Sequence, residues 1–212
     1  MTAGLRAVTF DLDGTLYDAA AARWPILWAS FPRWRTLRVG RAVREALRGR
    51  VFESGAALRD EEARMVGERL DVDRARARSR LDAAFDADVV RALARVGPRP
   101  SAREALSLLA GRGLLLAVVS DRRIADKLAA LGLHDLPWRA KVSADDVGAL
   151  KPAPVLFLAA CAAIGVAPDE AAHVGDRADT DDAGARAAGM RSLLLGRDGD
   201  LLQICRTLSC SA

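Results

Sequence analysis

Residues 8–16 read VTFDLDGTL, an apolar run that ends in two acids, a glycine and a threonine. In an extended chain, side chains two residues apart point to the same side, so the carboxylates of Asp11 and Asp13 face one site. Gly14 lets the chain turn sharply after them and exposes backbone amides to an anion such as phosphate. The stretch predicts a strand that delivers two carboxylates to a phosphate-binding turn, although an ordinary acidic turn has the same letters.

This pattern suggests a division of labour between the two acids. Asp11 is the candidate nucleophile, and Asp13 is the candidate group that protonates the leaving group and then takes a proton from water. Gly14 and Thr15 follow directly and are predicted to bind the phosphate of the substrate.

Four more apolar runs follow in the second half of the chain, and helical patterns separate them. Strands that alternate with helices are typical of a parallel sheet with helices on both faces, so we predict an α/β fold with a Rossmann-like, doubly wound core. The predicted strands are 7–10, 114–120, 140–143, 172–175 and 192–195, and the predicted helices are 122–131, 154–164, 182–188 and one that starts at Ser101 with a capping box to Glu104.

The stretch 19–96 has a different character. It lacks convincing strand runs and carries apolar residues at helical spacing, and Gly97-Pro98-Arg99-Pro100 follows it as a plausible hinge. We therefore predict an α/β catalytic core formed by residues 1–18 and 97–212, with a small helical cap at 19–96.

Polar residues follow several of the predicted strands. Ser120 and Asp121 end the second strand, Lys151 comes after the third, and Asp176 and Asp181 follow the fourth. Open parallel sheets bind ligands at the carboxyl ends of their strands, so these side chains are expected to meet Asp11 at one edge of the sheet.

The order of these segments resembles that of the haloacid dehalogenase superfamily of phosphatases. The matching segments are 8–16, 119–120, 143–152 and 174–190, so the resemblance covers the core and leaves out the insert. It implies an aspartyl-phosphate intermediate on Asp11 and general acid and base catalysis by Asp13. It also implies that Lys151 neutralises charge between the nucleophile and the phosphate.

The same resemblance implies a cofactor and further contacts. Mg²⁺ would be held by the Asp11 carboxylate, the Asp13 backbone carbonyl and Asp176, while Asp181 would support the metal site or orient Lys151. Ser120 would donate a hydrogen bond to a phosphoryl oxygen. We also predict that Asp121 binds substrate. Two positions depart from the common pattern: Asp121 stands where the family often has asparagine, and Arg177 stands where it often has serine.

A helical insert between the first two motifs resembles the mobile cap of that family. Aromatic residues at helical spacing (Trp24, Trp28, Phe31 and Trp34) would line the substrate pocket or form the core of the cap, and we favour the core. Nearby arginines (Arg33, Arg35, Arg38 and Arg41) would bind a second anionic group or form a solvated face.

Two related chemistries are disfavoured by particular residues. Dehalogenating relatives have another residue at the position of Asp13, because a halide leaves without a proton. Phosphonate-cleaving relatives need a lysine in the cap, and the three lysines here, Lys127, Lys141 and Lys151, all lie outside it.

Several alternatives remain at this stage. A sugar phosphomutase would keep the same five catalytic positions, and a non-catalytic binding module would keep the fold. The net charge of +4 and the pI near 9.4 suit a polyanion, but no basic run interleaved with aromatics supports nucleic-acid binding. We expect a cytoplasmic enzyme that acts on a small-molecule phosphate ester and has no membrane partner.

Overall fold

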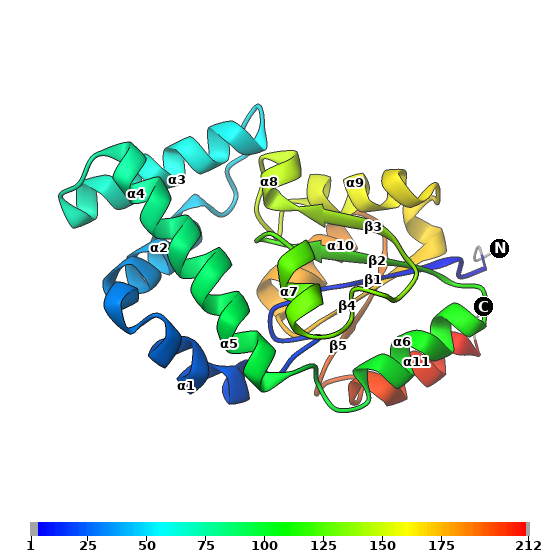
Figure 1. Ribbon diagram of the computed structural model, residues 1–212. Helices are drawn as coiled ribbons and strands as arrows, with labels where there is room; N and C mark the ends of the chain where they lie inside the picture. Colours follow the sequence, from blue (N-terminus) through cyan, green and yellow to red (C-terminus); the bar gives the residue numbers. More distant parts are fainter. Residues whose placement is uncertain (1–3, 211–212) are drawn as a thin grey trace.

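The computed structural model of the protein describes residues 4–210, which form a five-stranded parallel sheet flanked by helices (Figure 1). The strand order is β3-β2-β1-β4-β5. All five predicted strands are present, as β1 (Ala7–Phe10), β2 (Leu115–Ser120), β3 (Trp138–Ser143), β4 (Ala171–Gly175) and β5 (Arg191–Leu194). The prediction of an α/β, doubly wound core is confirmed.

The central strand β1 is buried on both faces. Its last residue, Phe10, pairs in register with Val118 of β2 and with Val174 of β4. Val8 and Phe10 belong to one hydrophobic cluster and Ala7 to another, because successive side chains of a strand point to opposite faces. Continuous apolar runs are therefore required here, as in other parallel sheets covered on both sides.

Helices cover the two faces of the sheet. On one face α6 (Ala102–Gly111) packs against α11 (Leu201–Ser209), and on the other α9 (Pro154–Ile164) packs against β2 and β3, with α10 (Ala183–Ala187) beside it. Shorter helical elements complete the core: α7 (Ala125–Ala130), α8 (Ala144–Val147), η3 (Pro168–Glu170) and η4 (Ala178–Asp182). The layers match those expected for a doubly wound sheet.

The predicted start of α6 is correct, but its predicted capping box is wrong. Ser101 has a left-handed backbone (φ 63°), and its side chain makes no capping hydrogen bond. Its backbone carbonyl instead accepts the first bond of the helix, from the amide of Ala105. The left-handed conformation takes the serine hydroxyl away from the geometry that a capping box requires.

The insert, residues 19–96, is helical as predicted (Figure 1). Its elements are α1 (Ala19–Ala29), η1 (Phe31–Arg33), α2 (Trp34–Leu47), α3 (Gly55–Leu70), α4 (Arg74–Leu81), η2 (Asp82–Asp88) and α5 (Val89–Val96). The last three follow one another without a break, and η2 is a wide π-helical stretch of the kind often found near functional sites. The division into a core and a separate cap domain stays a prediction.

The expectation that the aromatic stripe forms the core of the insert is wrong. Trp24, Trp28, Phe31 and Trp34 are all exposed, by 45–73%. Helical spacing shows that these residues share one face of α1 and its continuation, but it cannot show whether another element covers that face. Within residues 4–210, no helix has the length and apolar character needed to cross a bilayer.

Candidate active site

The candidate site lies where β1, β2 and β4 end, beneath the insert. Asp11 follows β1, Ser120 ends β2, and Asp176 follows β4. The chain winds outward from β1 in both directions across the sheet, and ligands bind at such a switch point. A cavity of about 320 Å³ opens here between the strand ends and the insert. The sequence-predicted residues Asp11, Asp13, Asp121, Lys151, Asp176 and Asp181 all line it.

Asp11 is held by a buried lysine. The Nζ atom of Lys151 lies 2.5 Å from Oδ1 of Asp11 and 2.8 Å from Oδ1 of Asp181. Burial alone would lower the pKa of Lys151, but the two carboxylates outweigh it and raise that pKa. Lys151 therefore stays charged, and Asp181 orients it toward Asp11.

Asp181 has a second task in the loop after β4. Its Oδ2 accepts hydrogen bonds from the backbone amides of Asp176 (3.3 Å) and Arg177 (3.1 Å). Burial would raise its pKa, but Lys151 and His173 outweigh this effect and lower it, so Asp181 is ionised. Both of its oxygens are thus occupied by the protein itself.

Asp11 has one free oxygen. Its Oδ2 is buried and has no hydrogen-bond partner within residues 4–210. Burial raises the pKa of Asp11 well above its usual range, and Asp181 and Asp13 raise it further, while Lys151 opposes them. A cation beside the free oxygen would relieve this penalty, because opposite charge favours the ionised carboxylate.

The acids around Asp11 fit a small divalent cation. Ligand oxygens of Asp11, Asp176 and Asp181 lie within 4.8 Å of one another. Oδ1 of Asp176, like Oδ2 of Asp11, is buried without a partner in the described part of the chain, and burial together with Asp181 raises the pKa of Asp176. Carboxylate oxygens are the ligands that Mg²⁺ prefers. Among the three clustered acids, Asp11 and Asp176 have oxygens without a partner in residues 4–210, and binding of the metal by the Asp13 carbonyl and by Asp181 stays a prediction.

Gly14 keeps Asp176 in place by leaving room for it. The backbone of Gly14 has φ +105°, and a Cβ atom there would lie 2.2 Å from Oδ2 of Asp176. Arg99 fixes the same turn, because its guanidinium donates to the carbonyls of Gly14 (2.6 Å) and Thr15 (3.0 Å). Thr15 is fully buried. Neither Gly14 nor Thr15 lines the cavity. Their contact with substrate stays a prediction.

Asp13 is bound by a lysine that the sequence analysis missed. Nζ of Lys127, on α7, lies 2.6 and 2.7 Å from the two carboxylate oxygens of Asp13, and the Tyr17 hydroxyl donates to Oδ1 at 2.7 Å. Burial would raise the pKa of Asp13, but Lys127 and Tyr17 outweigh it and lower that pKa. The sequence gives one signal for Lys127: lysine is rare in this chain, and Lys127 is one of only three lysines among the 32 lysine and arginine residues.

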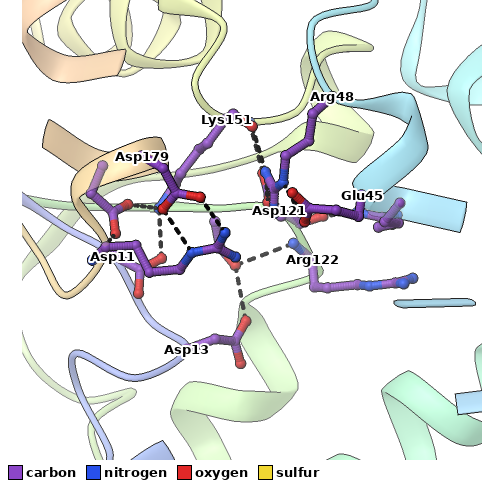
Figure 2. Close-up of polar contacts among 12 residues, drawn as sticks. Asp11, Asp13, Glu45, Arg48, Asp121, Arg122, Lys151 and Asp179 are labelled. Atoms are coloured by element: carbon purple, nitrogen blue, oxygen red, sulfur yellow. Dashed lines mark hydrogen bonds and ion pairs between the residues drawn. The ribbon is translucent and has the colours of Figure 1, made fainter. Parts of the chain in front are cut away.

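Ser120 and Asp121 are engaged within the protein. The Ser120 hydroxyl accepts from the amide of Arg122 at 3.2 Å and lies 3.4 Å from Oδ2 of Asp13. Asp121 accepts from the Lys151 amide (2.9 Å) with one oxygen and from Arg48 (2.8 Å) with the other. Figure 2 shows Arg48, the residue after α2, reaching toward Asp121. Asp121 therefore links the insert to the Lys151 loop, and its contact with substrate stays a prediction.

The insert supplies the roof of the cavity. Ile26 of α1, Phe85 of η2 and Val89 of α5 give it an apolar side. α2 and the residue after it add charged side chains: Arg41, Arg44, Glu45 and Arg48. Of the four arginines that the sequence analysis considered, Arg41 lines the cavity, whereas Arg33 forms an ion pair with the buried Asp88 at 2.7 Å. Arg35 and Arg38 are exposed.

A buried charge network joins the insert to the core. Glu62 of α3 accepts from Arg44 at 3.0 Å and from Arg122, which follows β2, at 2.9 Å. Arg44 also pairs with Asp145 of α8 at 3.2 Å. The Arg122 guanidinium stacks 3.7 Å from the centre of the Phe85 ring. Burial and the positive charge of Arg44 lower the pKa of Arg122 to about 10, although Glu62 opposes them.

The arrangement of Asp11, Lys151 and Asp181 can be compared with known families. The model of the haloacid dehalogenase-like hydrolases matches residues 5–189. The chain belongs to this family. A relative similar over most of its length is a phosphoglycolate phosphatase of Rhodospirillum rubrum, 35% identical over 207 residues, which are 87% of this chain and 77% of that protein.

Other relatives match in part. A glyceraldehyde 3-phosphate phosphatase of Methanopyrus kandleri is 40% identical over 34% of this chain, and a phosphoserine phosphatase of Thermus thermophilus is 39% identical over 46% of it. The matches span 30% and 40% of those proteins, less than half of their length.

Solved structures of the family share the fold. A 2-haloacid dehalogenase of Pseudomonas syringae has a TM-score of 0.65 at 25% identity and covers 98% of this chain and 100% of its own. A β-phosphoglucomutase of Clostridium difficile has a TM-score of 0.64 at 19% identity, over 91% of this chain and 85% of its own. The second likeness is one of fold alone.

Proposed function

We propose that this protein is a Mg²⁺-dependent phosphatase that hydrolyses a small phosphate monoester through an aspartyl-phosphate on Asp11. One observation carries the proposal: Lys151 binds Oδ1 of Asp11 at 2.5 Å, while Oδ2 is buried beside the cavity and has no partner within residues 4–210. A carboxylate held on one oxygen and free on the other is prepared to attack a bound phosphate.

In the first step, one carboxylate oxygen of Asp11 attacks the phosphorus atom, and the other oxygen stays with the groups that hold the carboxylate. The new O–P bond forms as the bond to the ester oxygen breaks, and Asp13 gives a proton to that leaving oxygen. Lys151 offsets part of the repulsion between carboxylate and phosphate. Mg²⁺ held by Asp11 and Asp176 would supply the remaining positive charge at this point.

In the second step, water attacks the phosphorus of the aspartyl-phosphate. Asp13 takes the proton from that water, the bond between Asp11 and phosphorus breaks, and inorganic phosphate leaves. Lys127 and Tyr17 favour the ionised form of Asp13, which is the form that acts as a base. Lys127 is therefore a positioning residue for Asp13.

The substrate is proposed to be small. A cavity of about 320 Å³ lies near the lower limit of ordinary ligand sites, roughly 300 Å³. The likeness to a phosphoglycolate phosphatase over 87% of the chain makes phosphoglycolate a sensible first compound in a panel of phosphate esters.

Hydrolysis of p-nitrophenyl phosphate tests the proposal. The wild type should hydrolyse p-nitrophenyl phosphate in the presence of Mg²⁺, and hydrolysis should stop when the metal is chelated. Asp11→Asn should lose activity by at least about 10³-fold because the attacking charge is gone. Asp169→Asn is the matched control, since Asp169 is exposed and outside the site. Full activity of Asp11→Asn would remove the nucleophile from the proposal.

Two related activities lie within the same fold. A dehalogenase needs no acid at the position of Asp13, so the carboxylate there supports phosphate chemistry. A sugar phosphomutase would return the phosphoryl group to a sugar. The likeness to a β-phosphoglucomutase concerns fold alone. Conversion of a sugar 1-phosphate that depends on a sugar bisphosphate, without phosphate release, would favour the mutase.

A further inference from the structure

Helix α1 is apolar on two opposite sides. Its inner side carries Ala22 and Ile26, which are buried, and the helix packs on α5. Its outer side carries Trp24 and Leu27, exposed by 62% and 40%, together with Trp28, exposed by 73%. A helix that is hydrophobic all round is normally covered on every side. The exposed apolar side chains on the outer side of α1 therefore indicate that another molecule binds there.

The exposed surface continues beyond α1. We call the set Trp24, Leu27, Trp28, Phe31 and Trp34 the aromatic face; every member is at least 40% exposed. The rings of Trp28 and Phe31 stack with centroids 6.4 Å apart and planes at 29°. Five large, exposed apolar side chains within eleven residues are a feature of the kind that marks an interaction surface.

The chain segment that carries the aromatic face is basic. Residues 19–44 contain six arginines and no acidic residue. Arg23, Arg35 and Arg38 are exposed, and no carboxylate of residues 4–210 pairs with them. Arg23 and Arg38 lie over the rings of Trp24 (5.8 Å) and Trp34 (6.0 Å). The aromatic rings are thus bordered by guanidinium groups that have no anion.

The sequence alone led us to expect no membrane partner, but from these exposed side chains we propose that the aromatic face docks on the surface of a membrane that contains anionic lipids. Tryptophan rings settle at the level of the lipid headgroups, and the bordering guanidinium groups can bind lipid phosphates. A second copy of this chain fits less well, because a symmetric contact would bring the arginines of one copy against those of the other. An anionic surface satisfies both the rings and the charges.

Docking would leave the cavity on the other side of α1. Ile26 lines the cavity from the inner side of the helix, whereas Trp24 and Trp28 point outward. Changes to the aromatic face should therefore spare the hydrolysis of a soluble ester. That assay separates a lost docking surface from a misfolded protein.

Vesicle binding tests the proposal with two readouts. The full chain is mixed with vesicles of phosphatidylglycerol and phosphatidylcholine, or of phosphatidylcholine alone, and is followed by co-sedimentation and by tryptophan emission. Three of the four tryptophans lie on the aromatic face, so docking on the anionic vesicles should shift the emission to shorter wavelength. The fourth, Trp138 of β3, donates a hydrogen bond from its indole nitrogen to the Leu133 carbonyl and lies away from the aromatic face.

Matched variants identify the surface. The double variant Trp24→Ser and Trp28→Ser should lose binding to anionic vesicles, and Arg35→Gln with Arg38→Gln should weaken it roughly thirtyfold, since each arginine near such a surface contributes about fivefold. Two sets of control changes lie on the sheet core: Val155→Ser with Leu158→Ser on α9, and Arg139→Gln on β3. These controls should bind like the wild type.

Three results would overturn the proposal. The first is a wild type that does not bind the anionic vesicles or binds neutral ones equally well. The second is unchanged binding by the double tryptophan variant. The third is a dimer that the tryptophan substitutions dissociate without any effect on vesicles, which would assign the aromatic face to a second copy.

Discussion

Nζ of Lys127 lies 2.6 and 2.7 Å from the two carboxylate oxygens of Asp13, the residue proposed to exchange protons with the substrate. The lysine is buried, whereas Asp13 is about one-third exposed toward the cavity. The ion pair and the Tyr17 hydroxyl hold the pKa of Asp13 below its usual value. This arrangement suits the second step, which needs a base, better than the first, which needs an acid.

Removal of Lys127 should move the pH profile. The first step needs protonated Asp13, so kcat/KM for an ester with a poor leaving group falls as pH rises through the pKa of Asp13. Lys127→Gln raises that pKa, and the fall should shift to higher pH. With p-nitrophenyl phosphate, whose leaving group needs little help from an acid, the shift should be small. Lys141→Gln, on an exposed lysine, is the control; an unmoved profile in Lys127→Gln would refute this role.

Mg²⁺ should stabilise the folded protein. A cation between Asp11 and Asp176 relieves the repulsion among their carboxylates, and a ligand that binds only the folded state raises Tm by mass action. Asp176→Asn should lose most of this increase, whereas Asp169→Asn should keep it. The increase should shrink as pH falls through the raised pKa values of Asp11 and Asp176, because protons then compete with the metal. Equal Tm increases in Asp176→Asn and the wild type would argue against this site.

A methyl group at Gly14 should disable the site. The added Cβ would lie 2.2 Å from Oδ2 of Asp176, so Asp176 or the turn must move. Activity and the increase in Tm caused by Mg²⁺ should both fall at least about tenfold. Gly113→Ala is the matched control: its φ is also positive (+81°), but nothing lies within 4 Å of the new atom. It should cost about 1 kcal/mol of stability and leave activity intact. Equal activity of the two variants would contradict the argument.

Neutralisation of Glu62 should weaken the joint between the insert and the core. Glu62 is 2% exposed and accepts from Arg44 and Arg122, so Glu62→Gln leaves two buried guanidinium groups facing one another. The free energy of unfolding should fall by about 3 kcal/mol in urea denaturation. Glu61→Gln, the neighbouring change, removes only surface ion pairs and should cost about 1 kcal/mol or less. A loss no larger in Glu62→Gln than in Glu61→Gln would refute the network.

Much of the core could be predicted from the sequence because its signals are local. The five strands are short apolar runs, and the acids that follow them, such as Asp11 and Asp176, meet because carboxyl ends of parallel strands share one edge. Lys151 does not end a strand, because α8 separates it from β3, but it reaches the same edge and contacts Asp11. The helical character of the insert could be predicted for the same reason, from periodic spacing alone.

What could not be predicted depends on contacts between distant segments. Lys127 of α7 reaches Asp13 across 114 positions of sequence, and nothing near position 127 indicates this contact. The aromatic residues of α1 and the segment after it were expected in a core, but they are exposed. Periodic spacing shows which residues share a face of a helix, and it does not show whether another element packs on that face. Ser101 has the letters of a capping box, yet its left-handed backbone prevents the bond.

The proposed mechanism depends on covalent phosphorylation of Asp11, and trapping that intermediate tests it. A phosphate ester is mixed with the Mg²⁺-loaded enzyme, the reaction is quenched in acid within one turnover, and the acyl phosphate is reduced with borohydride before peptide mass spectrometry. We expect reduction to the alcohol at Asp11 alone, and none in the Asp11→Asn variant. Steady turnover with no modified Asp11, or with the modification at another residue, would contradict it.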